Sequence, residues 1–311
     1  MDISVVIPVY GCKAAIPALY NRLVCTLESI VESFEIILVE DACPQHSWDE
    51  IVKLCNKDKR VVGIHFSRNF GQISAITAGL EKSKGNFVVV MDCDLQDRPE
   101  AIKELYGKIM EGYDVVFARR LKRKDDFITK LLSSAFYKVY GYLTDGVYDD
   151  TICNFSILKR KVVDSYCNMR EHNRAFTMFV RWFGFKETSI NLEAESRYEG
   201  KSSYTLNKKV KLAMGIITSQ SNKPLLFAVK LGFYMTLFSF LYIIYLIVRQ
   251  FVLGDVLIGW TTIVASIYLI GGLTIGVIGV VGIYIGNIFD EVKNRPLYII
   301  TEELNSGDDI Q

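Results

Sequence analysis

The sequence predicts an α/β domain with a mostly parallel sheet, followed by two membrane-spanning helices. Over the first 220 residues, short apolar runs alternate with helical patterns, as in strands joined by right-handed helical crossovers. Two long uncharged segments follow, of 18 residues between Lys230 and Arg249 and of 34 residues between Asp255 and Asp290. Segments of this length and composition are typical of helices that cross a bilayer.

The elements of the domain are expected in alternating β-α order. Strands are predicted over 3–10, 34–39, 61–66, 87–90 and 114–118, and helices over about 14–32, from about 47, from 72 to about 82 and from 99. The run 87–90 is apolar throughout, which suits a strand buried on both faces of a parallel sheet.

Three carboxylates, Asp92, Asp94 and Asp97, follow the run 87–90. Ligands of open α/β sheets collect just beyond the carboxyl ends of the strands. Asp92 and Asp94 are two residues apart, so in an extended chain their side chains point the same way. Such a pair suits Mg²⁺ or Mn²⁺ that also holds substrate phosphates. The alternative is an acidic loop that caps a helix; we favour the metal because a buried strand fixes the position of the pair.

Net charge, absent motifs and cysteine spacing argue against several other classes of protein. The net charge of +1 indicates neither nucleic acid nor an acidic partner. The first strand is not followed by a Gly-x-Gly-x-x-Gly dinucleotide fingerprint, and the sequence has no Walker loop. The seven cysteines are odd in number and form no Cys-x-x-Cys pair, which predicts free thiols in a reducing compartment. No signal peptide precedes Ile3, so we expect this domain in the cytosol.

Charges around the two apolar segments predict their orientation. Lysines crowd before the first segment, Lys293 and Arg295 follow the second, and the loop between them carries only Arg249 as a basic residue. The positive-inside rule therefore places both termini in the cytoplasm. Glycines at 272, 276, 279, 282 and 286 share one face of the second helix, which predicts close packing against the first helix or against another subunit.

An ordered set of motifs resembles the polyprenyl-phosphate glycosyltransferases. These are inverting family 2 enzymes with a GT-A fold, and they include the dolichyl-phosphate mannose synthases and the bacterial undecaprenyl-phosphate sugar transferases. The resemblance covers nearly the whole chain and rests on residues 5–10, Glu40-Asp41, 67–71, Asp92-Cys93-Asp94 with 95–100, Arg120-x-x-Arg123, 182–185, Arg197-x-x-Gly200-x-Ser202-x-Tyr204 and 290–298.

The resemblance implies a role for each matching residue. Nucleotide-sugar contacts would come from Pro8, Tyr10, Asp41, Arg68, Asp92 and Gln96, with Asp92 and Asp94 holding Mg²⁺ or Mn²⁺ against the donor diphosphate. Contacts to the acceptor phosphate would come from Arg120, Arg123, Arg197 and Ser202. Asp94, Asp97 and Asp150 are the candidate catalytic residues. For Arg197 and Ser202 the alternative is an ordinary loop before a helix.

The resemblance also implies an organisation and an activity. The expected parts are a cytosolic GT-A domain at 1–206, a juxtamembrane basic helix at 207–223, transmembrane helices at 224–250 and 256–289, and a cytosolic tail at 290–311. A single sugar would move from a nucleotide sugar, UDP-linked by resemblance to the bacterial branch or GDP-linked, to polyprenyl phosphate with inversion. The protein would lie in the inner membrane as a homo-oligomer, leaning towards a tetramer.

One position departs from the family pattern. Many relatives have Gly-Asp-Phe-Arg where this chain has Cys153-Asn154-Phe155-Ser156, so a carboxylate often taken as catalytic is an amide here. A phosphate monoester has a second pKa of about 6 and is mostly a dianion at neutral pH, so the acceptor needs no base. The reaction then depends on placement and charge stabilisation.

Two other functions compete with this interpretation. A processive polysaccharide synthase would carry a Gln-x-x-Arg-Trp motif and more spans, whereas Arg181-Trp182 here lacks the glutamine. A non-catalytic scaffold that binds lipid carriers would be expected to lose the acidic residues, all of which are present.

Overall fold

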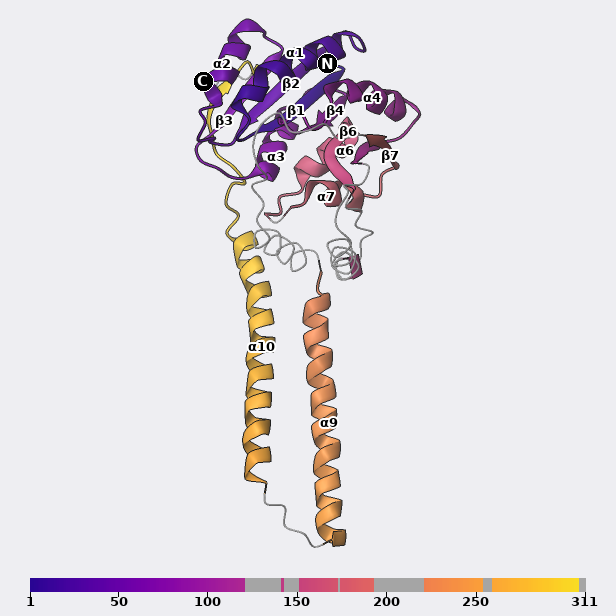
Figure 1. Cartoon of the computed structure of the whole chain (residues 1–311), viewed down its shortest axis with the longest axis vertical. Coiled ribbons are helices and arrows are strands. Elements are labelled where there is room, and N and C mark those ends of the chain that lie inside the picture. Colours follow the sequence, from indigo (N-terminus) through magenta and orange to yellow (C-terminus); the bar gives the residue numbers. More distant parts are fainter. Residues whose placement is uncertain (121–140, 143–150, 173, 193–220, 254–258, 308–311) are drawn as a thin grey trace. The chain divides into compact units, whose positions relative to one another are not determined.

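The computed structural model describes residues 1–120, 141–142, 151–172, 174–192, 221–253 and 259–307 (Figure 1). The chain divides into two compact units. One unit contains the N-terminal part of the chain together with the residues from Arg295 onward, and the other contains the two long helices near the C-terminus. The predicted boundary at 206 and most of the predicted basic helix at 207–223 lie outside the described residues.

The first unit is built on an eight-stranded sheet of order β7-β5-β6-β4-β1-β2-β3-β8. Its strands are β1 (Ile3–Val9), β2 (Phe34–Glu40), β3 (Val61–Phe66), β4 (Phe87–Val90), β5 (Val115–Arg120), β6 (Ile152–Lys159), β7 (Glu187–Leu192) and β8 (Ile300–Leu304). β1 pairs in parallel with β2 and β4, β2 with β3, and β5 with β7. β6 and β8 pair antiparallel to their neighbours. The predicted mostly parallel sheet is therefore confirmed.

Helices cover both faces of this sheet. They are η1 (Lys13–Ala15), α1 (Ile16–Glu28), α2 (Trp48–Lys57), α3 (Gln72–Lys82), η2 (Pro99–Ala101), α4 (Ile102–Met110), α6 (Arg160–Asn168) and α7 (Phe176–Trp182). One core contains Val5 and Ile7 of β1 with side chains of α1, α2 and α4, and the other contains Val6 with side chains of α3, α6 and α7. This alternation follows from the two-residue period of a strand.

Helix α3 lies unusually close to β1 because of a glycine. A Cβ atom at Gly79 would lie 2.3 Å from Cγ1 of Val6 and 3.3 Å from Cγ2 of Val39. Since β4, β1 and β2 are neighbours and parallel, their carboxyl ends lie along one edge of the sheet. Helix α3 begins at Gln72, directly after the loop that follows β3, so its first turn lies at that same edge.

The C-terminal segment completes the sheet as β8, which pairs antiparallel with β3. Tyr298 stacks on the buried ring of Phe66 at 5.1 Å between ring centroids and donates its hydroxyl to Glu81. The side-chain amide of Asn305 donates to the carbonyl oxygens of Cys55 and Val61, at 2.8 and 2.9 Å. The predicted tail at 290–311 therefore contributes a strand that covers the edge of β3, which would otherwise expose unpaired backbone groups.

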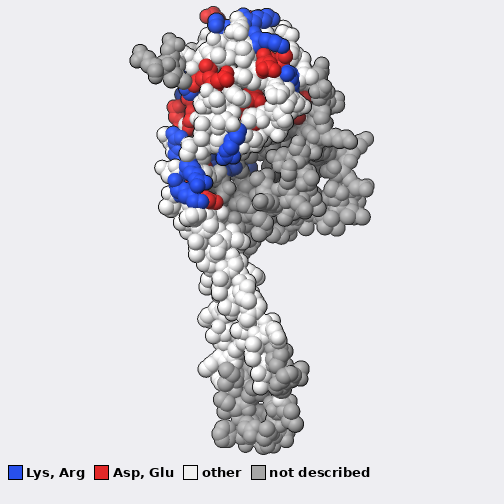
Figure 2. Space-filling view, turned by 90° about the vertical axis from the view of Figure 1, so that its left-hand side faces the viewer, with Lys and Arg blue, Asp and Glu red and all other residues white. Residues whose placement is uncertain are grey.

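The second unit contains α9 (Lys223–Leu253) and α10 (Trp260–Val292), which lie side by side (Figure 1). Residues Lys223–Tyr242 and Ser266–Val292 are apolar and long enough to cross a membrane. Most of their described surface is uncharged in Figure 2. Among the described residues, a Cβ atom added at any glycine from 271 to 286 would meet no atom within 4 Å. Within the described chain the stripe therefore does not pack closely against the first long helix, and its packing against another subunit stays a prediction.

Gly79→Ala should destabilise the protein by about 1–3 kcal/mol, because the new methyl group would overlap Val6 in a packed core. The matched control is Gly107→Ala in α4, where a Cβ atom would meet nothing within 4 Å. There the change should be neutral or stabilise by about 0.5–1 kcal/mol, since alanine favours helix. Thermal unfolding of the purified full chain in detergent compares the two variants, and equal midpoints would contradict the close approach of α3.

Tyr298→Ala should lower the free energy of unfolding by about 1–3 kcal/mol, through loss of the ring stacked on Phe66 and of its buried apolar area. The neighbouring side chain of Ile299 is 51% exposed, so Ile299→Ala is the control. Both are measured by the same thermal unfolding. A Tyr298→Ala protein as stable as the control would mean that the C-terminal strand contributes little to the sheet.

Candidate active site

The acidic loop after β4 alternates between buried and partly exposed side chains. Asp92, Asp94 and Gln96 are partly exposed, whereas the residues that alternate with them along the loop, Cys93, Leu95 and Asp97, are buried. The expectation that Asp92 and Asp94 share one side of the chain agrees with this alternation. Asp97 lies on the other side and is 5% exposed.

A tight turn holds Asp94 in place. Its Oδ1 atom accepts the backbone N–H of Gln96 at 3.1 Å. Leu95 between them has a φ of 60°, in the left-handed region that residues other than glycine seldom adopt. Such backbone strain is found most often at functional sites, where the surrounding structure maintains it.

The acid pair fits a divalent cation that shares its ligands with a substrate. Among the residues that the structure describes, no group of three or more His, Cys, Asp or Glu side chains could hold a metal ion. Mg²⁺ is commonly held by one or two carboxylates, with substrate phosphates and water completing the octahedron. Asp92 and Asp94 therefore suit a cation that binds together with a diphosphate, but not one held by protein ligands alone.

Asp41 follows β2 and is 3% exposed. Its two carboxylate oxygens accept the backbone N–H groups of Phe70 and Gly71 at 2.6 and 2.8 Å. Burial raises the pKa of the Asp41 carboxyl, and the two N–H donors oppose that rise by stabilising the charged form. Whatever else Asp41 contacts, it anchors the loop between β3 and α3.

Glu40, the residue before Asp41, holds the turn that follows β2. Glu40 is 1% exposed, and its carboxylate accepts the backbone N–H groups of Ala42 and Cys43. It also bonds Nδ1 of His65 in β3, whose ring stacks on Trp48 at 5.1 Å between centroids. Ala42 has a φ of 46°, and the Glu40 contacts hold this left-handed turn beside Asp41.

Asn154 lies in β6, the strand that pairs with β4. β4 and β6 pair antiparallel with Val90 opposite Ser156. Asn154 comes two residues before Ser156 in β6, at the end of the sheet where β4 leads into the acidic loop. The position that departs from the family pattern is thus at the same edge of the sheet as the acid pair.

Two cysteines of this edge are paired, which corrects the prediction of seven free thiols. Cys12, in the loop after β1, forms a disulfide with Cys93 between the two acids, with 6.3 Å between their Cα atoms. The other five cysteines form no disulfide. The count and spacing of cysteines could not reveal this pair, because only the parallel pairing of β1 with β4 brings positions 81 residues apart together.

The remaining predicted residues are placed as follows. Pro8 is buried within β1, Tyr10 is 51% exposed just after it, and the guanidinium of Arg68 lies over the ring of Phe70 at 4.2 Å. Arg120 is the last residue of β5, at the end of the sheet that carries the acid pair. Asp150, Arg123, Arg197 and Ser202 lie outside the described residues.

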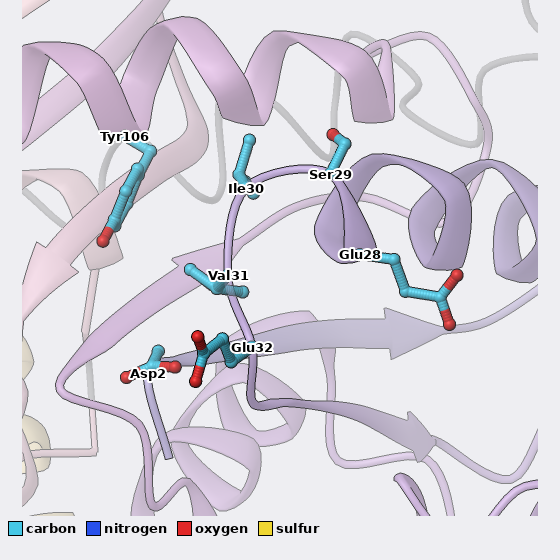
Figure 3. A pocket seen from close by; sticks show the side chains of 7 residues that line it. All are labelled: Asp2, Glu28, Ser29, Ile30, Val31, Glu32 and Tyr106. Carbon is cyan, nitrogen blue, oxygen red and sulfur yellow. The ribbon is translucent and has the colours of Figure 1, made fainter.

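A pocket elsewhere in the first unit does not belong to this site. It surrounds the turn between α1 and β2, at the opposite edge of the sheet where β1 begins (Figure 3). Its lining residues are Asp2, Glu28, Ser29, Ile30, Val31, Glu32 and Tyr106. Asp2 accepts hydrogen bonds from Ser33, and Glu28 pairs with Arg60, so these two carboxylates have partners within the fold.

Two residues of the site have no role in the sequence-based prediction. The side-chain amide of Gln72, the first residue of α3, donates to Oδ1 of Asp92 at 2.7 Å. Glu40 supports the loop at Asp41. Their positions in the sequence could have indicated a role, because each lies where a predicted strand ends or a predicted helix begins at the carboxyl edge of the sheet.

Known proteins resemble this chain along almost its whole length. Residues 4–167 match the family model described as glycosyl transferase family 2. An uncharacterized glycosyltransferase of Bacillus subtilis, YkcC, is 37% identical over 96% of this chain and 92% of its own length. The SfII prophage-derived bactoprenol glucosyl transferase of Shigella flexneri is 33% identical over 96% of this chain and 97% of its own length. The undecaprenyl-phosphate 4-deoxy-4-formamido-L-arabinose transferase of Proteus mirabilis is 30% identical over 96% of this chain and 92% of its own length.

A solved structure resembles this chain in fold. The glucosyl-3-phosphoglycerate synthase of Mycobacterium tuberculosis, in complex with Mn²⁺, uridine-diphosphate and phosphoglyceric acid, has a TM-score of 0.51 and 17% sequence identity. The match covers 70% of this chain and 76% of that chain. The expected GT-A fold is confirmed.

Asp41→Asn should destabilise the protein by about 1–3 kcal/mol, because an amide offers one oxygen and its NH₂ group would face a backbone N–H. Asp164→Asn is the control, since that carboxylate is 60% exposed and forms a surface ion pair with Arg160. Thermal unfolding without nucleotide measures both. If Asp41 served only to contact a ligand, its substitution would leave the unfolding midpoint unchanged.

Proposed function

Because the chain belongs to glycosyl transferase family 2, we propose that it transfers one sugar from a nucleotide-diphosphate sugar to polyprenyl phosphate in a membrane. The observation that carries this proposal is the extent of the likeness to the bactoprenol and undecaprenyl-phosphate transferases. The family model ends at residue 167, but those matches span 96% of the chain and so include the two apolar helices. Both parts that such a reaction needs, a donor-binding domain and a membrane anchor, are then shared.

In the proposed reaction an oxygen of the lipid phosphate attacks the anomeric carbon of the donor sugar. The bond from that carbon to the nucleoside diphosphate breaks, and the configuration inverts. The attacking phosphate is mostly a dianion at neutral pH. An amide at Asn154 is therefore compatible with the chemistry, since no proton has to be removed from the acceptor.

We propose a binding partner for each candidate residue. We assign Asp92 and Asp94 as the protein ligands of Mg²⁺ or Mn²⁺, which when bound would stabilise charge on the departing nucleoside diphosphate. Pro8, Tyr10, Asp41, Arg68 and Gln96 are assigned to the nucleotide sugar, with UDP as the proposed nucleotide. Arg120, Arg123, Arg197 and Ser202 are assigned to the acceptor phosphate, and Asp94, Asp97 and Asp150 remain the candidate catalytic residues.

We further propose that α9 and α10 span the inner membrane and that both chain termini are cytoplasmic. Two observations support this orientation. Lys293 and Arg295 follow the second helix, whereas the loop between the helices has only Arg249 as a basic residue. In addition, β8 follows α10 and pairs with β3, which precedes α9. Strands of one sheet have to lie on the same side of a membrane, so the hairpin would begin and end on that side.

Asp94→Asn should lower turnover at least about 100-fold, because an amide is a poor ligand for the cation and carries no charge to hold it. The protein should remain folded and membrane-bound. Membranes that contain the protein are incubated with polyprenyl phosphate and a panel of UDP- and GDP-sugars, and the lipid product is weighed by mass spectrometry.

Asp164→Asn, distant from the carboxyl edge, is the control and should retain activity. Undiminished activity of Asp94→Asn would remove the cation from the proposal. A product that carries a polymer, and not one sugar, would overturn the proposed reaction.

A further inference from the structure

The Gln72 side chain connects two segments of the candidate site. One is the segment before α3 that is bonded to Asp41, and the other is the loop after β4 that carries the acid pair. The Nε2 atom of Gln72 donates to Oδ1 of Asp92 at 2.7 Å, and so joins the first turn of α3 to the loop after β4. Neither the strand pattern nor the spacing of the acids requires this contact. It exists because β4 and β1 are neighbours and α3 packs over β1.

The position of Gln72 is fixed from both sides. The two residues before it, Phe70 and Gly71, donate their backbone N–H groups to Asp41. The helix after it approaches β1 so closely that only glycine fits at position 79. The amide is therefore presented to Asp92 by a backbone that is held in place, and not by a mobile loop.

An amide is well suited to orient a metal-binding carboxylate. It occupies a lone pair of one oxygen and leaves acceptor capacity on the carboxylate for a cation. Being neutral, it neither repels the cation nor competes with it for the charge, as a lysine or arginine at this position would. Groups that hydrogen-bond to metal-binding side chains in this way tune metal affinity, typically by 10- to 100-fold.

We propose that Gln72 is a positioning residue, which orients the Asp92 carboxylate toward the divalent cation and the donor diphosphate. This inference rests on the proposed function, because it assumes that Asp92 binds the cation. Through Phe70 and Gly71 the same segment is joined to Asp41. The backbone from Phe70 to Gln72 thus connects Asp41 to Asp92 through hydrogen bonds at each of its ends.

The inference is tested with two substitutions that differ in charge. Gln72→Met keeps the approximate length of the side chain and removes the donor. Gln72→Glu keeps the shape and places a second carboxylate against Asp92. The control is Lys108→Met in α4, because Lys108 also donates to an exposed carboxylate, that of Glu111, at the same distance of 2.7 Å.

The measurement is binding of MnCl₂ to the purified full chain by calorimetry and by the EPR signal of free Mn²⁺, with UDP or GDP present, whichever the wild type binds. Affinity for the nucleotide without metal and the thermal unfolding midpoint are measured alongside. Gln72→Met should weaken Mn²⁺ binding about tenfold, the lower end of the range, because the hydrogen bond is exposed. Gln72→Glu should have an affinity for Mn²⁺ different from that of the wild type and the same unfolding midpoint. The control Lys108→Met should match the wild type in both measurements.

The outcomes separate the two proposals. If the wild type binds Mn²⁺ with nucleotide and forms the glycolipid, but Gln72→Met binds Mn²⁺ equally well, the role of Gln72 is wrong and the proposed function stands. If Gln72→Met binds Mn²⁺ more weakly and its unfolding midpoint falls as well, the role of Gln72 is structural and the inference is again overturned. If the wild type binds no Mn²⁺ with either nucleotide, the metal site itself fails, and the role of Gln72 fails with it.

Discussion

Parallel pairing of β1 with β2 and β4 brings the carboxyl ends of three strands to one edge of the sheet, and the candidate site depends on this pairing. Asp41 follows β2, Cys12 follows β1, and Asp92 follows β4. These residues come from segments that are far apart in the chain. Because the side chains buried on both faces fix the register of the strands, the polar residues just beyond them take up fixed positions relative to one another.

A set of hydrogen bonds then connects these positions across the edge. Asp41 holds the backbone that precedes α3, and Gln72 at the start of α3 holds Asp92. Glu40 supports the turn beside Asp41 through hydrogen bonds to the backbone of Ala42 and Cys43 and to His65. Asp41 was expected to bind the nucleotide, and its hydrogen bonds to Phe70 and Gly71 add a structural role. A carboxylate with four lone-pair sites has the capacity for both.

The C-terminal strand connects the hairpin to the domain by a different route. β8 covers the free edge of β3, and Tyr298 and Asn305 secure it on either side. Glu302 in β8 also accepts a hydrogen bond from Trp48, which stacks on His65 beside Glu40. A segment that follows the second apolar helix thus contacts residues that support the candidate nucleotide site. The pairing of this strand with β3 is also what supports the proposal that the hairpin returns to the side of the membrane from which it started.

The sequence by itself determined the local parts of this protein. Alternation of apolar runs and helical patterns predicted strands β1 to β5 and the helices between them, and the uncharged segments predicted α9 and α10. The acid pair was found as well, because its two members lie in one short segment with the two-residue period of an extended chain.

Only the tertiary structure decided which segments meet. β6 lies antiparallel between β4 and β5, and this brings Asn154 to the edge of the sheet where the acid pair follows β4. The disulfide between Cys12 and Cys93 and the contact between Gln72 and Asp92 also join residues distant in sequence. Local periodicity reports which face of an element is apolar, but strand order and register are set by the packing of the whole core. Contacts that depend on order and register are therefore not readable from any single stretch of the chain.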